Sequence, residues 1–157
     1  MASSAAPLAV RAASAQDVPS LVHLLDESAA SGVTLPRSHA ELEQIWGGFL
    51  VAEQGGDVLG CGALDVLTPR LAEIRSVTVS PAAAGRGVGR AVVEALVDRA
   101  EALGVETLCL LTRVPAFFAR SGFFEVSEAT LPENYIELAI RARGRTTQER
   151  ISMMRAL

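Results

Sequence analysis

Lysine is absent from this sequence of 157 residues, so all 14 of its Lys and Arg side chains are arginine. The absence excludes pyridoxal and other Schiff-base chemistry, which needs the amine of a lysine side chain. It also excludes the P-loop of nucleotide-binding proteins, in which a lysine follows the last glycine. Enzymes that depend on either feature are therefore ruled out.

Histidine and cysteine are scarce, with two residues of each. His23 and His39 lie far from Cys61 and Cys109 in the sequence, and this spacing offers no metal-ligand set. Both cysteines lie in apolar runs typical of strands, which predicts buried thiols rather than a disulfide. Reduced thiols favour a reducing compartment, the cytoplasm.

Long hydrophobic runs are missing too, because none approaches the ~20 residues of a membrane span. The N-terminal run MASSAAPLAVRAAS lacks the charged start and apolar core of a signal peptide. The net charge is −4 and no basic run occurs, so we expect neither a nucleic-acid nor a membrane partner. With 50% hydrophobic residues, the chain is expected to form one domain over residues 1–157.

A glycine-rich turn is the most informative feature that the sequence contains. Gly85, Gly87 and Gly89 are spaced two apart, between a predicted strand (71–79) and a helix predicted to run to Leu103. Glycines there leave the free N–H groups of the helix start open to an anion, which predicts a phosphate site. Arg86 and Arg90 add positive charge, and a turn shaped by glycine for geometry alone is the alternative. The helix is expected to bury one face, formed by Val88, Val92, Ala95, Leu96 and Leu103.

The turn does not match the dinucleotide fingerprint G-x-G-x-x-G. The sixth position is Arg90 when the motif is counted from Gly85, and Val92 when it is counted from Gly87.

The other elements are predicted from periodicity, caps and turns. Capping boxes at Ser14–Asp17 and Ser38–Glu41 begin two helices, and Gly55-Gly56 forms a hairpin. His23 falls off the apolar face of the first helix and is expected to be solvated. Residues 31–36 form a loop, and residues 128–145 show no clear pattern. Predicted strands are 8–11, 49–53, 58–67, 71–79, 107–111, 123–126 and 151–157. The helices that begin at the two capping boxes are predicted to end near residues 28 and 46, and a short helix is predicted at 115–120. The order predicts an α/β fold, a mixed sheet with helices on both faces.

The phrases EIRSVTVSP, GRGVGRAVVEAL and FFARSGFF, in this order, resemble the GNAT superfamily of acyl-CoA-dependent N-acyltransferases from about Val10 to Val126. The resemblance implies a mostly antiparallel sheet splayed between its fourth and fifth strands, acetyl-CoA as co-substrate, and often a homodimer. The family's loop falls on 84–89, with Ala84 where Arg or Gln is usual. The implied cofactor-binding residues are Val77, Thr78, Val79, Gly85, Arg86, Gly87, Val88, Gly89, Arg90 and Phe118.

Acyl transfer to an amine needs a base for the amine, a proton donor for the thiolate and an N–H donor for the oxyanion. Glu73 is the candidate base, because a carboxylate in an apolar strand is costly unless it is paired or used. Strand alternation predicts that it shares a face with Arg75, Val77 and Val79. A solvated residue at a strand end, or a local pair with Arg75, is the alternative.

The sequence identifies the proton donor for the leaving thiolate less clearly than the base. Phe118 stands where many relatives carry a tyrosine, and it cannot donate a proton. Thr112 is the nearest hydroxyl by pattern, although it could equally cap the end of its strand. Ser121 and Tyr135 remain alternatives.

A narrower resemblance links SGVTLPRS, LAEIRSVTV, LCLLT with PAFFARSGF, and LPENY to the acetyltransferase domain of N-acetylglutamate synthases. It implies that Glu73 is the base, that Thr112 assists, and that Arg37 binds a substrate carboxylate. A guanidinium can hold a carboxylate through two hydrogen bonds, although an ordinary surface arginine is the alternative. Arg75 is our second substrate-binding candidate; Arg145 and Arg150 are further possible carboxylate contacts, and the region after Pro132 departs from the bacterial pattern.

The sequence thus predicts an acetyl-CoA-dependent N-acetyltransferase that acts on the α-amine of glutamate or a related amino acid. One alternative is the same chemistry on a polyamine, a peptide N-terminus or an antibiotic. The other is an acyl-CoA-binding module that has lost catalysis, an idea prompted by Ala84 and Phe118.

Overall fold

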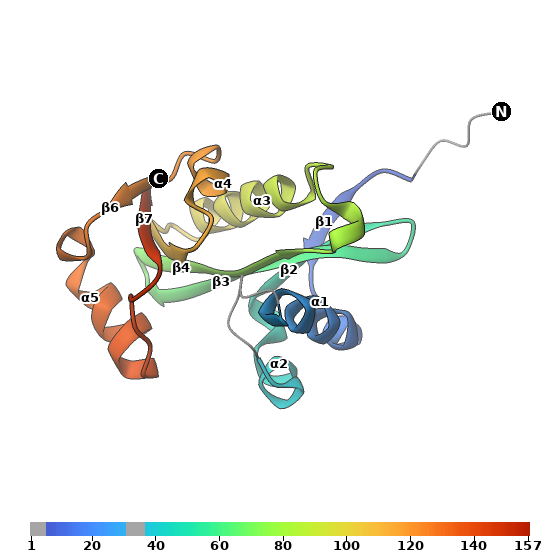
Figure 1. Cartoon of the computed structure of the whole chain (residues 1–157), viewed down its shortest axis with the longest axis horizontal. Coiled ribbons are helices and arrows are strands. Elements are labelled where there is room, and N and C mark those ends of the chain that lie inside the picture. The colour runs from blue at the N-terminus through green and yellow to red at the C-terminus, as the bar shows by residue number, and fades with distance from the viewer. Residues whose placement is uncertain (1–5, 31–36) are drawn as a thin grey trace. The chain divides into compact units, whose positions relative to one another are not determined.

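The computed structural model describes residues 6–30 and 37–157 (Figure 1). The loop predicted at residues 31–36 lies outside the described residues. The chain divides into two compact units, Met1–Ala63 with Ser76–Leu96, and Leu64–Arg75 with Val97–Leu157. The single-domain boundary therefore stays a prediction, and each unit is described by itself.

The seven strands follow the order β1-β2-β3-β4-β5-β7-β6. Neighbours pair antiparallel in β1–β2, β2–β3, β5–β7 and β6–β7, whereas β4 and β5 are parallel. The parallel register joins 71–73 to 107–109, at the start of both strands. The strands are β1 (Ala9–Ala12), β2 (Phe49–Gln54), β3 (Asp57–Thr68), β4 (Leu71–Val79), β5 (Thr107–Thr112), β6 (Phe124–Val126) and β7 (Ile151–Ala156). The predicted mixed, mostly antiparallel sheet is confirmed, and each predicted strand is present within two residues of its expected bounds.

The predicted helices are also present: α1 (Val18–Ala30), α2 (His39–Ile45), α3 (Val88–Ala102) and α4 (Pro115–Ala119). The helical region that was not predicted is α5 (Glu133–Tyr135), which continues as a π turn (Ile136–Ile140) and a 3₁₀ turn (Arg141–Arg143). Val88, Val92 and Leu96 are buried on α3 as expected. Leu103 was assigned wrongly to this face: the helix ends before it, and it is 55% exposed. None of the described helices is long and apolar enough to cross a bilayer.

Strand β3 separates the two helix layers of the first unit. Its Cys61 and Ala63 pack into a core with α1 and α2, in which Leu21, Leu25 and Leu42 are fully buried. The alternate residues, Gly60 and Gly62, face α3, because side chains alternate along a strand. Figure 1 shows α1 and α2 on one side of these strands and α3 on the other.

The two glycines of β3 allow α3 to lie close to the sheet. A Cβ atom at Gly62 would lie 2.8 Å from Leu96 Cδ1 and 2.9 Å from Val92 Cγ1. A Cβ atom at Gly60 would lie 2.8 Å from Val88 Cγ1, in the first residue of α3. Such short distances leave no room for a larger residue without movement of the helix.

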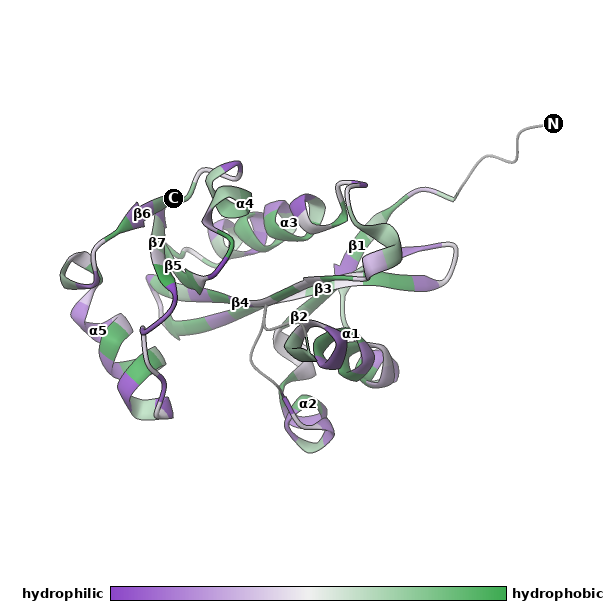
Figure 2. Cartoon of the chain, viewed as in Figure 1, coloured by the Kyte–Doolittle hydropathy of each residue, from purple (hydrophilic) through white to green (hydrophobic). Residues whose placement is uncertain are grey.

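The second unit has its own core, which the unpredicted helical region completes. Figure 2 shows that α5 and the turns after it carry both hydrophobic and hydrophilic residues. The hydrophobic ones pack against the start of β4 and the middle of β5; the buried members of this core are Leu71, Cys109, Leu131, Tyr135, Ala139 and Ile140.

Both cysteines are buried free thiols, which confirms that prediction. Burial raises the pKa of each thiol to about 12, and the Glu73 charge adds to this effect at Cys109. The thiols therefore stay protonated at neutral pH and behave as apolar core groups.

Asp17 joins the start of α1 to the edge of the sheet. Its Oδ2 accepts the Ser14 backbone N–H at 2.7 Å, as the predicted capping box requires. Arg11 of β1 donates to both carboxylate oxygens, at 2.7 and 2.9 Å, and also to Glu53 of β2. The hydrogen bonds from Arg11 lower the pKa of Asp17 to about 2, despite its burial.

Replacing Asp17 with Asn is expected to lower the free energy of unfolding at pH 7 by up to about 2 kcal/mol. A pKa lowered from 3.8 to about 2 stabilises the fold above pH 3.8, and this contribution is lost as the pH falls toward 2. Urea denaturation at pH 7 and near pH 2 measures both limits. Glu53→Gln is the matched control, because Glu53 shares Arg11 but is more exposed; an equal loss in both variants would contradict the assignment.

Candidate active site

The predicted glycine turn joins β4 to α3 in the first unit. Gly85 (φ 76°) and Gly87 (φ 81°) both adopt left-handed backbone conformations that other residues rarely take. The Gly87 carbonyl accepts the Ala91 N–H at 3.0 Å, which begins the helix. No atom lies within 4 Å of a Cβ built on either glycine, so the turn is open on that side. An open turn beside the free N–H groups of a helix start is suited to phosphate.

The two arginines of the turn have protein partners. Arg86 donates to the Gln54 side chain of the β2–β3 hairpin at 2.5 Å, which ties the turn to the sheet. Arg90 forms an exposed ion pair with Glu94 at 3.0 Å, one helical turn along α3. Ala84 is exposed and offers only its backbone to a ligand. The charge expected at the turn is thus present, partly offset by Glu94.

Strand β4 is interrupted at Ser76, which has a left-handed φ of 59°. Such a value is uncommon outside glycine and breaks the extended repeat of the strand. The prediction that Glu73 shares a face with Val77 and Val79 assumed unbroken alternation, and for these two valines it stays a prediction. Val77 Cγ2 lies 3.3 Å from a Cβ built at Gly62, on the α3 side of the sheet. Within the described residues, the buried Thr78 hydroxyl has no hydrogen-bond partner.

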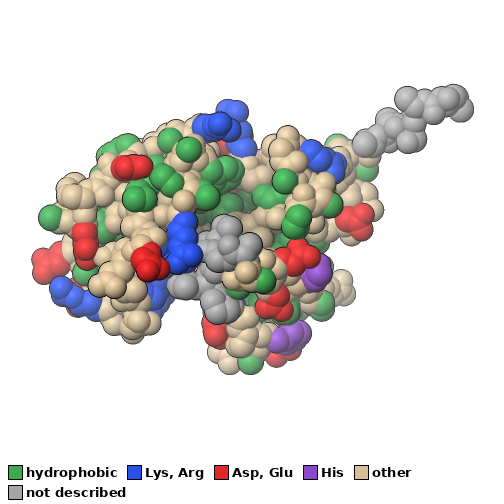
Figure 3. All heavy atoms as spheres, viewed as in Figure 1, with side chains coloured by type: hydrophobic (Ala, Val, Ile, Leu, Met, Phe, Trp, Pro, Cys, Tyr) green, Lys and Arg blue, Asp and Glu red, His purple; other side chains and the backbone are tan. Residues whose placement is uncertain are grey.

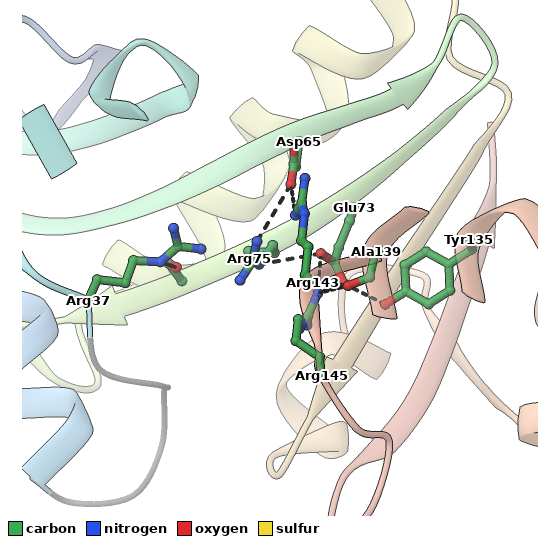
Figure 4. Close-up of polar contacts among 9 residues, drawn as sticks. Arg37, Asp65, Glu73, Arg75, Tyr135, Ala139, Arg143 and Arg145 are labelled. Carbon is green, nitrogen blue, oxygen red and sulfur yellow. Dashed lines mark hydrogen bonds and ion pairs between the residues drawn. The ribbon is translucent and has the colours of Figure 1, made fainter. Parts of the chain in front are cut away.

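Ser76 also holds the candidate substrate-binding Arg37. Arg37 Nε donates to Ser76 Oγ at 3.1 Å, across 39 residues of sequence. The Ser76 carbonyl accepts a weak hydrogen bond from the Cys61 thiol at 3.6 Å. Arg37 therefore lies over the interruption of β4 rather than free in solvent, and Figure 4 shows it there.

The candidate base, Glu73, is fully buried in the second unit. Its Oε2 accepts the Tyr135 hydroxyl at 2.5 Å, and Arg145 Nη1 donates to Oε1 at 2.9 Å and Oε2 at 3.1 Å. Arg75 Nε lies 3.4 Å from Oε1 (Figure 4). Burial excludes the alternative that Glu73 is a solvated residue at a strand end. The alternative pair with Arg75 is present, but the contacts of Glu73 with Tyr135 and Arg145 are shorter.

Arg75 and Arg143 share a second carboxylate, Asp65 of β3. Arg75 Nη1 lies 3.6 Å from Asp65 Oδ2, and Arg143 donates a hydrogen bond to the same oxygen. Burial would raise the pKa of Asp65, but the hydrogen bond and charge of Arg143 and the charge of Arg75 outweigh it and lower the pKa. Arg75, our second substrate-binding candidate, is thus already paired with two protein carboxylates.

The hydroxyl candidates for the proton donor differ in their surroundings. Thr112 is buried, and its Oγ1 accepts the Val114 N–H at 2.9 Å, so it does cap the end of β5. Accepting that bond leaves its own O–H free to donate. Ser121 is half-buried, and its carbonyl accepts a hydrogen bond from Arg155. Phe118 is buried, and its ring makes edge contacts with Phe117 and Phe123 at centroid distances of 4.9 and 6.0 Å.

The described residues contain no group of three or more His, Cys, Asp or Glu that could hold a metal ion. Both histidines are exposed, and each pairs with a glutamate one turn along its helix. Figure 3 shows histidine side chains at the surface. This placement agrees with the surface position predicted for His23.

A family model described as the acetyltransferase (GNAT) family matches residues 19–123. This chain belongs to the GNAT family. The family fold and its recognition from the three sequence phrases are thereby confirmed.

Two curated relatives of this GNAT chain have similar sequences. An amino-acid acetyltransferase of Mycobacterium tuberculosis is 41% identical over 120 residues, which cover 74% of this chain and 68% of the relative. An amino-acid acetyltransferase of Neisseria meningitidis is 32% identical over 128 residues, 80% of this chain but 29% of the relative. The GNAT chain thus spans under a third of the longer relative.

Two solved structures have the same fold as this chain. A Mycobacterium tuberculosis protein solved with CoA and a second ligand has a TM-score of 0.84 and 32% identity, over 95% of this chain and 99% of that one. An N-acetylglutamate synthase of Neisseria gonorrhoeae, solved with coenzyme A and N-acetyl-glutamate, has a TM-score of 0.85 and 30% identity. The match covers 97% of this chain and 35% of the synthase.

Sequence reasoning placed Tyr135 only among the alternative proton donors and Arg145 only among possible substrate contacts. The structure instead brings both to Glu73, from 62 and 72 residues away in the sequence. A signal for this helical region was present, because Leu131, Tyr135 and Ala139 recur every four residues and all three are buried. Arg150 lies near other cations: its pKa is lowered by burial and by the charges of Arg113 and Arg145.

Proposed function

We propose that this GNAT chain transfers the acetyl group of acetyl-CoA to the α-amine of an amino acid, with glutamate as the first candidate. The observation that carries the proposal is the placement of Arg37, which the Ser76 hydroxyl holds over the interrupted strand β4. The guanidinium of an arginine presents its N–H donors in a planar fork that matches the two oxygens of a carboxylate. The name of the Mycobacterium tuberculosis relative, an amino-acid acetyltransferase, supports a carboxylate-bearing substrate.

The CoA pyrophosphate is proposed to bind the N–H groups of the turn that contains Gly85 and Gly87 and begins α3. The left-handed glycines and the space around them fit this group. The pantetheine arm is assigned to the backbone of residues 77–79 by the resemblance, with Phe118 as a wall. Acetyl-CoA supplies the activated acyl group, so the protein has to bind, orient and move protons.

Glu73 is proposed as the base that takes a proton from the substrate ammonium, directly or through one water. Thr112 is proposed as the donor to the departing thiolate, because its O–H is free while its oxygen accepts the Val114 N–H. An N–H group of the β4 backbone is suited to the oxyanion of the tetrahedral intermediate.

The reaction is tested by thiol release from acetyl-CoA across a panel of amines. The panel contains glutamate, other amino acids, a polyamine, a peptide with a free N-terminus and an aminoglycoside. Turnover with an amino acid is expected. Turnover with another amine alone would replace the substrate, and tight CoA binding without any turnover would indicate an acyl-CoA-binding module.

Replacing Arg37 with Ala is expected to raise KM for the amino acid by about 10²-fold, because two charge-assisted hydrogen bonds to the substrate carboxylate are lost. The Kd for CoA should change less than twofold. Arg70→Ala is the matched control, because Arg70 is an exposed arginine whose side chain forms a long, 3.9 Å ion pair with Glu106. This variant should leave KM unchanged. An unchanged KM in Arg37→Ala would remove Arg37 from the site.

A further inference from the structure

The two oxygens of the Glu73 carboxylate have unequal surroundings. Oε2 accepts two hydrogen bonds, from the Tyr135 hydroxyl at 2.5 Å and from Arg145 Nη1 at 3.1 Å. Oε1 accepts one hydrogen bond, from Arg145 Nη1 at 2.9 Å, while Arg75 Nε lies farther away at 3.4 Å. Each carboxylate oxygen has two acceptor positions, so Oε1 retains the better place for an incoming proton.

Tyr135 is itself fully buried, and its hydroxyl donates to Glu73 rather than to water. Burial and the Glu73 charge hold the pKa of this phenol well above its usual value. The hydroxyl therefore stays a neutral donor to Oε2 at neutral pH. A phenol that is already committed to Glu73 is poorly suited to protonate a thiolate, which removes Tyr135 from the proton-donor candidates.

Arg145 reaches Glu73 because of how the helical region ends. Gly144 (φ 62°) ends it in a Schellman motif, with the Arg145 N–H on the Ile140 carbonyl at 2.9 Å and the Gly144 N–H on the Arg141 carbonyl at 3.1 Å. The chain turns back there, and Arg145 Nη1 also donates to the Ala139 carbonyl of the π turn at 2.9 Å. The buried Nε–H of Arg145 has no partner among the described residues, so this orientation is kept at the expense of one hydrogen bond.

We infer that Tyr135 and Arg145 are positioning residues of the acetyl transfer, which fix the Glu73 carboxylate so that Oε1 is the atom that accepts the proton of the substrate ammonium. The inference rests on the proposed function. The proton moves from the amine nitrogen to Oε1, and the nitrogen lone pair then forms the bond to the acyl carbon. The other charged or titratable groups around Glu73 are Arg75 on its own strand, Cys109 opposite it on β5, and Arg143.

Tyr135→Phe tests the inference, because phenylalanine keeps the ring in the core and removes only the donor. We expect kcat to fall about tenfold, as for the loss of one hydrogen bond to a charged group. KM for the amine and the Kd for CoA should stay within twofold. The acid limb of the kcat/KM profile should move up by about 1 pH unit, because one stabilising donor to the carboxylate is gone.

A second variant and a control complete the experiment. Arg145→Lys keeps the charge but not the planar fork, and it should move the acid limb in the same direction. Ser127→Ala removes an exposed hydroxyl that contacts Thr130, away from Glu73, and it should change neither rate nor profile. Circular dichroism establishes that each variant is folded before rates are compared.

The outcomes separate the inference from the proposed function. If the wild type acetylates amino acids while Tyr135→Phe keeps both its rate and its pH profile, the inference alone is wrong. If the wild type acetylates only a different amine, the proposed function is wrong, and the same comparison on that amine still decides the inference. A wild type without activity on any amine overturns both.

Discussion

Replacing Glu73 with glutamine is expected to lower kcat for acetyl transfer by about 10²- to 10⁴-fold, the range of a lost general base. The carboxamide keeps the shape of the side chain but cannot take a proton from the substrate ammonium. Because Glu73 is fully buried against Arg145, the variant should also be less stable, since a buried cation loses its charged partner. Rates therefore have to be compared at a temperature where thermal melts show the variant folded.

Asp65→Asn is the matched control for Glu73→Gln. Asp65 also pairs with Arg75 and accepts a hydrogen bond from Arg143, whereas Tyr135 and Arg145 donate hydrogen bonds to Glu73. Its replacement should lower kcat by less than about tenfold, because a partly exposed ion pair contributes little. Equal losses in the two variants would show that the ion pairs rather than a base are what activity requires. Full activity in Glu73→Gln would remove Glu73 from the reaction.

Replacing Gly87 with valine is expected to weaken CoA binding by at least about 10²-fold. Gly87 has a φ of 81°, and a β-branched residue in this conformation costs roughly 1–2 kcal/mol. The turn will relax toward an allowed conformation, and the N–H groups at the start of α3 will then no longer converge on a phosphate. Isothermal titration calorimetry with CoA measures the loss.

Gly104→Val provides an unusually close control for this change. Gly104 has a φ of 83°, and a Cβ there also meets no atom within 4 Å, but it follows the end of α3 rather than preceding its start. Both variants should lose similar stability, whereas only Gly87→Val should lose CoA affinity. Normal affinity in Gly87→Val would mean that this turn is not the phosphate site.

The features that could be predicted from the sequence are those that a few neighbouring residues determine. The capping box at Ser14, the Gly55-Gly56 hairpin and the glycine turn before α3 all depend on local backbone chemistry, and the structure contains each of them. Buried Cys61 and Cys109 followed from apolar runs. Local patterns therefore predicted most of the fold.

The partners of Glu73 could not be predicted in this way. Tyr135 and Arg145 lie 62 and 72 residues from it in the sequence. Tyr135 belongs to α5, whereas Arg145 follows the Schellman motif at Gly144 that ends the helical region. The left-handed Ser76 was missed for a different reason: its flanking sequence is that of an ordinary strand, so nothing local signals the interruption. The alternation argument for Val77 and Val79 took no account of that interruption.

The pair Gly60 and Gly62 on β3 has a consequence for how mutational data on this protein should be interpreted. Gly60 faces Val88, so a single added methyl group on this strand would push on the first residue of α3. The position of this helix end, the proposed anion site, is therefore set from the sheet as well as from the turn. Loss of cofactor affinity in a variant is consequently no evidence that the residue touches the cofactor. Replacement of a buried glycine, which has no side chain, can lower the affinity as much as replacement of a residue that contacts the cofactor.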